Sequence, residues 1–214
     1  MSRILITSGP TREYLDPVRY LTNASSGRMG AALAAAVVEA GHQVVVVGGP
    51  ADVEYTAAAE VHRVVSTQEM LDACLRLFPA CDGLIAAAAP CDYRPPSVAR
   101  RKIHKTGEPL RLELVETPDV VATLAADKKA YQWIVAFALE TEDPRTGAMQ
   151  KLQRKRCDLI VVNGPHAVQS IGTQVEILDR RGESLGRFAG DKSDVAKEIF
   201  RVINRQLIHP TQEP

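Results

Sequence analysis

Short, nearly continuous apolar runs recur along this chain at intervals that leave room for a helix between them. Arg3 to Ser8 is the first run, and "QVVVVGGP" (43–50), "GLIAAAA" (83–89), "WIVAFAL" (133–139) and "LIVVN" (159–163) follow. Runs of this kind are typical of parallel strands that are buried on both faces. Their alternation with helices predicts an α/β fold with a doubly wound, mostly parallel, Rossmann-like sheet.

Helix signals lie between these runs. "MGAALAAAVVEAGH" (29–42) contains Gly41 near its end, and glycine is the preferred left-handed terminator of a helix. Ser66 and Glu69 have the spacing of a capping box ahead of a helix over 67–78. Further expected elements are a strand over 61–65, a helix over 119–129 with Thr117 as cap and Pro118 as first residue, and a polar helix from about Thr146 to Arg156.

The C-terminal part departs from this alternation. Residues 175–188 form two runs joined by a Gly-Glu-Ser turn, which predicts a β-hairpin, and 191–207 reads as an amphipathic closing helix. We therefore expect one domain over residues 1–207 and a flexible tail over 208–214. A chain of 214 residues can bury a sizeable core without disulfides or metals.

Composition excludes several classes of function. Twenty-six basic and 26 acidic residues cancel, so the overall charge gives no reason to expect nucleic acid or an acidic membrane surface as a partner. The four cysteines lack metal-ligand spacing and read as small core residues, and the five histidines show no ligand spacing either. Without a secretory signal or an apolar span of 18 residues, the chain is expected in the cytoplasm.

Two segments, 9–26 and 90–110, are too long to be simple connections. Both leave the carboxyl ends of predicted strands, where open α/β sheets bind their ligands. The first supplies backbone amides, hydroxyls, an asparagine and arginines ahead of a helix, a combination suited to an anion. It matches neither the dinucleotide nor the triphosphate glycine fingerprint. The alternative is that Ser25 or Ser26 is a plain helix cap.

The second segment begins with a run of alanines, whose small side chains let a flat ring or a backbone approach closely. Asp92 follows and can accept hydrogen bonds from hydroxyls or an amine. The arginines and lysines after it predict a cationic flap that closes over phosphate charge, although a solvated basic loop would have the same composition.

A third group of residues lies between 133 and 163. Phe137 leaves a strand toward the predicted cleft, and Lys151 and Lys155 share one helix face at a spacing of i and i+4. Two such lysines repel each other unless an anion lies between them, which would suit a polyphosphate. Solvation of both lysines is the alternative.

Taken together, "SGPTREYLDPVRYLTNASSGRMG" (8–30), "AAAAPCDYRP", "KIHK", "TPDVV", "FALET" and "KLQRK…DLIVVN" resemble phosphopantothenoylcysteine synthetase in order and spacing. The resemblance extends from about Arg3 to Leu207. It implies a ligase of coenzyme A biosynthesis that joins 4'-phosphopantothenate to cysteine through an acyl-nucleotidyl intermediate. It further implies CTP or ATP as co-substrate, Mg²⁺ carried with the nucleotide, no metal site of the protein's own, and a homodimer.

The resemblance also implies a role for individual residues. Asn23 and Lys102 are the catalytic candidates, Asn23 holding the substrate carboxylate or acyl oxygen and Lys102 acting from the flap. Substrate-binding candidates are Arg19, Asn23, Ser25, Ser26 and Gly27. Nucleotide-binding candidates are Ala86, Ala87, Ala88, Asp92, Lys102, Pro118, Asp119, Val120, Val121, Phe137, Lys151 and Lys155.

The chain departs from the family pattern at His104, which stands in place of a lysine, at Leu139, which stands in place of a small residue, and at Pro90-Cys91. Bacterial relatives are commonly fused to a flavin-dependent decarboxylase. We expect that domain to be separate or fused elsewhere, and no flavin in this chain. Two alternatives are an NAD(P)-dependent reductase, weakened by the missing glycine fingerprint, and a nucleotide sensor that binds without releasing pyrophosphate.

Overall fold

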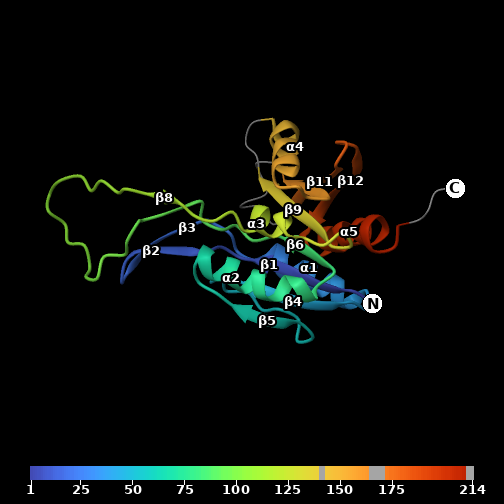
Figure 1. Cartoon of the computed structure of the whole chain (residues 1–214), viewed down its shortest axis with the longest axis horizontal. Helices are drawn as coiled ribbons and strands as arrows, with labels where there is room; N and C mark the ends of the chain where they lie inside the picture. Colours follow the sequence, from blue (N-terminus) through green and yellow to red (C-terminus); the bar gives the residue numbers. More distant parts are fainter. Residues whose placement is uncertain (140–142, 164–171, 211–214) are drawn as a thin grey trace.

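The protein is described by a computed structural model covering residues 1–139, 143–163 and 172–210. Its centre is an eight-stranded sheet of order β12-β11-β10-β9-β6-β1-β4-β5 (Figure 1). The strands that run parallel are β1 (Arg3–Ser8), β4 (Gln43–Gly48), β5 (Glu60–Arg63), β6 (Gly83–Ala86), β9 (Trp133–Leu139) and β10 (Leu159–Asn163). The hairpin of β11 (Gly172–Asp179) and β12 (Ser184–Asp191) adds two antiparallel strands. The predicted fold class is confirmed.

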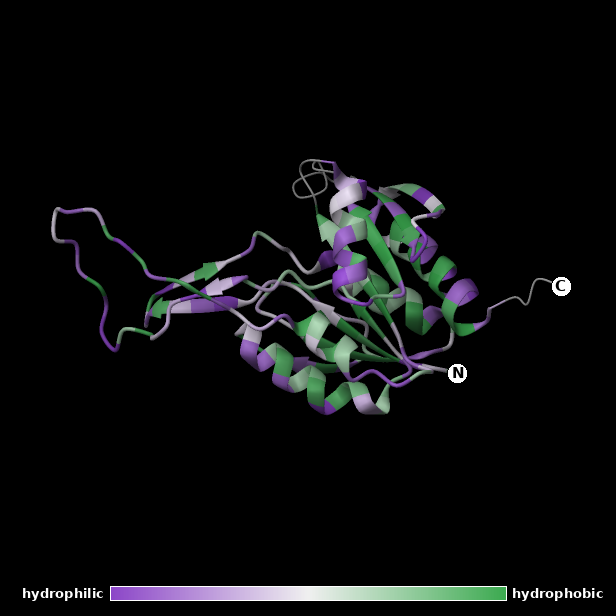
Figure 2. Ribbon diagram, turned by 45° about the horizontal axis from the view of Figure 1, so that its top comes forward, coloured by the Kyte–Doolittle hydropathy of each residue, from purple (hydrophilic) through white to green (hydrophobic). Residues whose placement is uncertain are grey.

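Helices cover both faces of the sheet and enclose two apolar cores. The helices are α1 (Arg28–Glu39), α2 (Thr67–Leu77), α3 (Val120–Ala126), α4 (Pro144–Arg154) and α5 (Lys192–Ile203), with a 3-10 turn at Phe78–Ala80 and a π-helical turn at Asn204–Ile208. One core joins α2, α3 and α4 to one face, and the other joins α1 and α5 to the opposite face. Figure 2 shows the apolar strands between these layers. Burial on both faces explains why the strand sequences are nearly continuous in apolar residues.

Most local signals in the sequence hold in the structure. Gly41 has φ +83°, as its terminating position requires. Ser66 caps α2 by accepting a hydrogen bond of 3.1 Å from the Glu69 N–H, while the Glu69 carboxylate accepts from the Val65 N–H. The strand expected over 61–65 lies at 60–63. Helix α4 begins two residues before its predicted start, because Pro144 occupies the first turn.

The predicted cap of α3 is wrong. Asp119 is the N-cap, and its carboxylate accepts a hydrogen bond of 3.0 Å from the Ala122 N–H. The Thr117 hydroxyl instead donates to the Cys91 carbonyl. Pro118 therefore precedes the helix, and Thr117 ties the start of α3 to the segment that follows β6.

The two long segments contain short strands as well as loops. The antiparallel strands β2 (Arg12–Asp16) and β3 (Arg19–Thr22) form a hairpin in the first segment. The second segment begins with β7 (Tyr93–Arg94), which pairs with β8 (Val115–Glu116). The chain between them, residues 95–114, is called the arm below, and it extends away from the sheet (Figure 1).

Asp16 is buried where the arm meets the β2–β3 hairpin. Its carboxylate accepts hydrogen bonds from the Val18, Arg19 and Ile103 N–H groups, at 2.9, 2.8 and 3.0 Å, and from the Arg19 guanidinium at 2.6 Å. Burial alone would raise the pKa of Asp16, but these hydrogen bonds outweigh it and lower the pKa from 3.8 to about 2.

Because the pKa of Asp16 is lowered in the folded protein, its contribution to stability depends on pH. The contribution of Asp16 is complete above its unfolded-state pKa of 3.8 and is lost as pH falls through about 2. We expect Asp16→Asn to destabilise the protein at pH 6, and this deficit to shrink when unfolding is measured at pH 2.5. Urea titrations of both proteins at the two pH values check this. An equal deficit at both pH values would contradict it.

The four cysteines are buried and free, as expected of small core residues. Burial raises the pKa of Cys74 and of Cys157 to about 12. Neither thiol therefore ionises appreciably near neutral pH. Within the described part of the chain, no helix combines the length and apolarity needed to cross a membrane.

Candidate active site

A cavity of about 1120 Å³ opens at the carboxyl end of the parallel strands. Its walls come from the end of β6, the end of β9, the start of α1, the start of α3 and one face of α4. This is the edge at which open α/β sheets bind ligands. The two long segments flagged in the sequence do contribute to it.

The first wall is the loop 23–27 that leads into α1. Gly27 is the N-cap with φ +73°, and no described side chain caps the helix. The alternative that Ser25 or Ser26 is a plain cap is therefore wrong. Both serines line the cavity, as do Asn23 and Gly27. The first amides of α1 are left to a ligand or to water, and the helix dipole favours a negative charge beside them.

Asn23 bridges this wall to the segment that leaves β6. Its side-chain amide donates hydrogen bonds to the Ala89 carbonyl at 3.2 Å and to the Pro90 carbonyl at 2.8 Å. Asn23 is 66 positions from Ala89 and 67 positions from Pro90 in the chain. The Asn23 amide therefore fixes the spacing between the two walls.

The second wall contains the alanine run and Asp92. Ala86, Ala87, Ala88 and Asp92 all line the cavity, with Ala86 buried at the end of β6. Cys91 also lines the cavity, and its N–H donates to the Thr11 hydroxyl at 2.8 Å. The small alanine side chains leave room against the sheet, and Asp92 adds an exposed carboxylate at the rim.

The third wall joins α3 to α4. Pro118, Asp119, Val120, Val121, Phe137, Lys151 and Lys155 line it. The Lys155 ammonium forms an ion pair with Asp119 at 2.9 Å. Burial would raise the pKa of Asp119, but the Ala122 N–H and the Lys155 ammonium hold it below its ordinary value. Lys155 thus has the Asp119 carboxylate as a counter-ion, and a polyphosphate between Lys151 and Lys155 stays a prediction.

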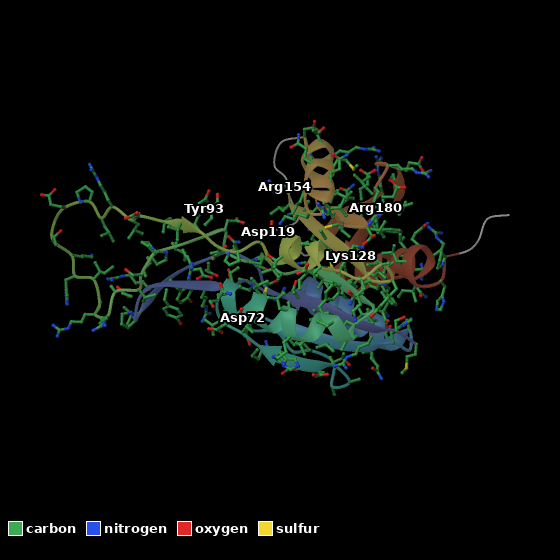
Figure 3. All side chains as sticks on the ribbon, viewed as in Figure 1. Asp72, Tyr93, Asp119, Lys128, Arg154 and Arg180 are labelled. Atoms are coloured by element: carbon green, nitrogen blue, oxygen red, sulfur yellow. The ribbon has the colours of Figure 1, made fainter. Side chains whose placement is uncertain are left out.

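Basic side chains outnumber acidic ones around the cavity. The described lining has five basic residues, Arg28, Lys151, Arg154, Lys155 and Lys192, and three acidic ones, Asp92, Glu116 and Asp119. Figure 3 shows Arg154 on α4 and Asp119 at the start of α3, with Tyr93 where the arm leaves the body of the molecule. An excess of positive charge in a cleft suits anionic ligands.

Among the lining residues that sequence reasoning missed are Asn163, Thr173 and Lys192. Asn163 ends β10, so the strand-end argument that found Phe137 could have found it. Its side-chain oxygen is buried without a partner among the described residues. Lys192 begins α5, and no local pattern connects that position to the cleft.

Two candidates from the sequence, Arg19 and Lys102, are not among the described residues that line the cavity. Arg19 pairs with Asp16 and donates to the Ile103 carbonyl at 2.9 Å. Lys102 is exposed on the arm. In this structure the arm does not line the cavity of its own protomer, and its backbone is held to the β2–β3 hairpin.

Metal ligands are sparse. Within residues 1–139, 143–163 and 172–210, no three His, Cys, Asp or Glu side chains are grouped so as to hold a metal ion. Asp119 is already engaged by Lys155 and by the α3 amides. These donors do not fit a protein-made magnesium cage, for which several oxygen ligands must converge.

Known proteins resemble this chain over much of its length. The family described as DNA/pantothenate metabolism flavoprotein C-terminal domain matches residues 1–207. The coenzyme A biosynthesis bifunctional protein CoaBC of Vibrio cholerae is 45% identical over 163 residues, which are 75% of this chain and 41% of that protein. A cysteine/cysteine sulfinic acid decarboxylase from an unknown prokaryotic organism is 39% identical over 213 residues, covering 97% of this chain and 59% of that protein.

The chain therefore spans only about two fifths to three fifths of the length of these relatives. A solved structure gives a fuller match. The crystal structure of the C-terminal domain of CoaBC is 34% identical, with a TM-score of 0.82, and covers 97% of this chain and 96% of that one.

Proposed function

The chain belongs to the DNA/pantothenate metabolism flavoprotein C-terminal domain family, and from that premise we propose that it is a phosphopantothenate–cysteine ligase. The resemblance to phosphopantothenoylcysteine synthetase is confirmed at the level of the family. One observation carries the proposed activity. A single cavity brings together the Asn23 loop, the alanine run with Asp92, and the basic face of α4.

The proposed reaction has two steps. The carboxylate of 4'-phosphopantothenate attacks the α-phosphorus of CTP or ATP, pyrophosphate leaves, and an acyl-nucleotidyl anhydride forms. The cysteine amine then attacks the acyl carbon, loses a proton, and displaces the nucleoside monophosphate. Both steps bring anions together, so they need positioning and charge neutralisation more than a protein nucleophile.

The cavity supplies these requirements from its own residues. The uncapped start of α1 and the cations of α4 neutralise phosphate charge, and Ala86–Ala88 leave space for a ring against β6. Asp92 accepts hydrogen bonds from the nucleotide. Lys155, which Asp119 holds at the wall of the cavity, would supply a cation to the phosphates. Mg²⁺ would arrive with the triphosphate.

We propose further that residues 1–207 form the catalytic domain, with 208–214 as a tail of which 211–214 lie outside the described residues. The protein acts as a cytoplasmic homodimer, with a decarboxylase fused or separate. No flavin is assigned to this chain. Of the "QSIGTQ" stretch (169–174) and of "FALET" (137–141), residues 169–171 and 140–141 lie outside the described residues, whereas Thr173 lines the cavity.

The proposal is tested by supplying phosphopantothenate, cysteine and magnesium with CTP or ATP in parallel. We expect equal yields of pyrophosphate and of the new amide with the preferred nucleotide. Nucleotide binding without pyrophosphate would favour a sensor, and binding of NADH would favour a reductase. Carbon dioxide released from cysteine without nucleotide would instead favour a decarboxylase.

Lys155→Met tests the nucleotide wall. Removing this cation takes away one charge-assisted contact to phosphate and leaves Asp119 facing the triphosphate unpaired. We expect about tenfold weaker nucleotide binding by calorimetry, corresponding to about 1.4 kcal/mol. Lys197→Met is the matched control, because it also breaks a lysine–carboxylate pair, at 3.0 Å to Glu39, but on the outer surface. Equal affinity in the two variants would contradict the assignment.

A further inference from the structure

One residue of the arm, Ile103, is held to the β2–β3 hairpin through both its backbone N–H and its carbonyl. The Ile103 N–H donates to the Asp16 carboxylate at 3.0 Å, and the Ile103 carbonyl accepts from the Arg19 guanidinium at 2.9 Å. The same Arg19 nitrogen donates to Asp16 at 2.6 Å. The two contacts of Ile103 join residues 84 and 87 positions apart in the chain, so they determine where the arm leaves the hairpin.

Lys102 lies between this anchor and a second one. The Ala99 N–H donates to the Leu15 carbonyl at 3.0 Å, so the backbone is held three residues before Lys102 and one residue after it. Ile103 is partly buried, whereas the Lys102 side chain is exposed. The hairpin thus fixes the backbone of Lys102 and leaves its ammonium group available.

Asp16 and Arg19 act as one unit in this anchor. Each oxygen of the buried Asp16 carboxylate accepts two hydrogen bonds, so an amide in its place would turn NH₂ toward two donors. The Arg19 guanidinium donates hydrogen bonds to the Asp16 carboxylate and to the Ile103 carbonyl. Its side chain is therefore committed to the arm and is not directed into the cavity as a contact for substrate.

We propose that Asp16 and Arg19 are positioning residues that set the place of Lys102 in the ligase reaction. This inference rests on the proposed function and on the role in converting the acyl-nucleotidyl intermediate that the resemblance implies for Lys102. It replaces the direct contact between Arg19 and a substrate anion that the sequence suggested. Arg19 then acts only through Lys102. Replacing Arg19 should therefore lower kcat and leave substrate affinity unchanged.

A double-mutant cycle on Arg19 and Lys102 tests this dependence. We expect Arg19→Gln to lower kcat about tenfold with the KM for phosphopantothenate within about twofold of wild type, and Lys102→Gln to lower kcat at least as much. The double variant should be no slower than Lys102→Gln alone. If the two reductions in kcat multiply in the double variant, or if the KM rises in Arg19→Gln, the positioning role is overturned. Wild-type turnover in Lys102→Gln would overturn it as well.

Hydrogen exchange gives a readout independent of activity. The Ile103 amide should exchange faster in Arg19→Gln than in wild type, while Arg19→Lys, which keeps the charge and a donor, should restore part of both protection and kcat. Arg19 is a suitable first variant because its side chain is 41% exposed, so the fold tolerates its change. Asp16→Asn serves as the second variant.

The control is Arg187→Gln, which breaks an arginine–carboxylate pair with Glu176 at 3.1 Å on the edge of the sheet. It should change neither kcat nor exchange at Ile103. Unchanged exchange in Arg19→Gln would overturn the anchor. If the wild-type protein forms no amide product, the proposed ligase function fails and this inference fails with it, an outcome distinct from additivity in an active enzyme.

Discussion

Asn23→Asp is expected to lower kcat/KM for amide formation about 100-fold, a loss of about 3 kcal/mol in transition-state stabilisation. The Asn23 amide donates to the Ala89 and Pro90 carbonyls. A carboxylate cannot donate, so both bonds would be replaced by repulsion between oxygens and the two walls would separate. The same negative charge would also oppose the carboxylate of the substrate.

The measurement is product formation under saturating nucleotide, with thermal unfolding as a check on the fold. Gln68→Glu is a matched amide-to-acid control, because the Gln68 amide also donates a hydrogen bond, to Asp72, on the exposed face of α2. We expect that control to keep wild-type activity. If Asn23→Asp keeps the wild-type kcat/KM, Asn23 has no role in the proposed site.

Gly30→Ala is expected to destabilise the protein by about 2–4 kcal/mol, because overpacking a buried contact forces the backbone to shift. A Cβ at Gly30 would lie 2.2 Å from Ser8 Oγ, 2.4 Å from Ser8 Cβ and 3.1 Å from Ser8 Cα. These atoms belong to β1, so α1 would have to move away from the sheet. The melting temperature should fall by roughly 5–10 °C.

A compensating change separates this clash from a general effect of the substitution. Ser8→Gly removes the Cβ and Oγ that alanine would meet, at the cost of the hydrogen bond from Ser8 Oγ to the Gly27 carbonyl. We expect the double variant to regain part of the lost melting temperature. If Gly30→Ala melts with the wild type, the close approach of α1 to β1 is not a constraint.

Sequence reasoning succeeded where one local pattern implied one environment. Runs such as "VVVV" and "LIVVN" can be buried only in the centre of a sheet covered on both faces, and the helices between them follow from spacing. The strand-end argument then brought the Asn23 loop and the alanine run to one edge, and the spacing of Lys151 and Lys155 placed both lysines on one helix face. The cavity is built from those segments.

The arm could not be predicted because its contacts are distant in the chain. The strands β2 and β3 are short and partly exposed, so they lack the apolar pattern of buried strands. Strands β7 and β8 have two residues each and pair across the whole arm. The direction of the arm depends on Asp16 and Ile103, which are 87 positions apart, and no local signal connects them.

The edge strand β5 has a consequence for solubility. An open sheet edge offers unpaired backbone groups to which another polypeptide can add, and long flat edges invite aggregation. Strand β5 has only four residues, of which Glu60 bonds both Arg3 and His62 through its side chain. An incoming strand would have to strip water from these charges to gain very few backbone hydrogen bonds. The sheet is therefore protected on this side against open-ended growth.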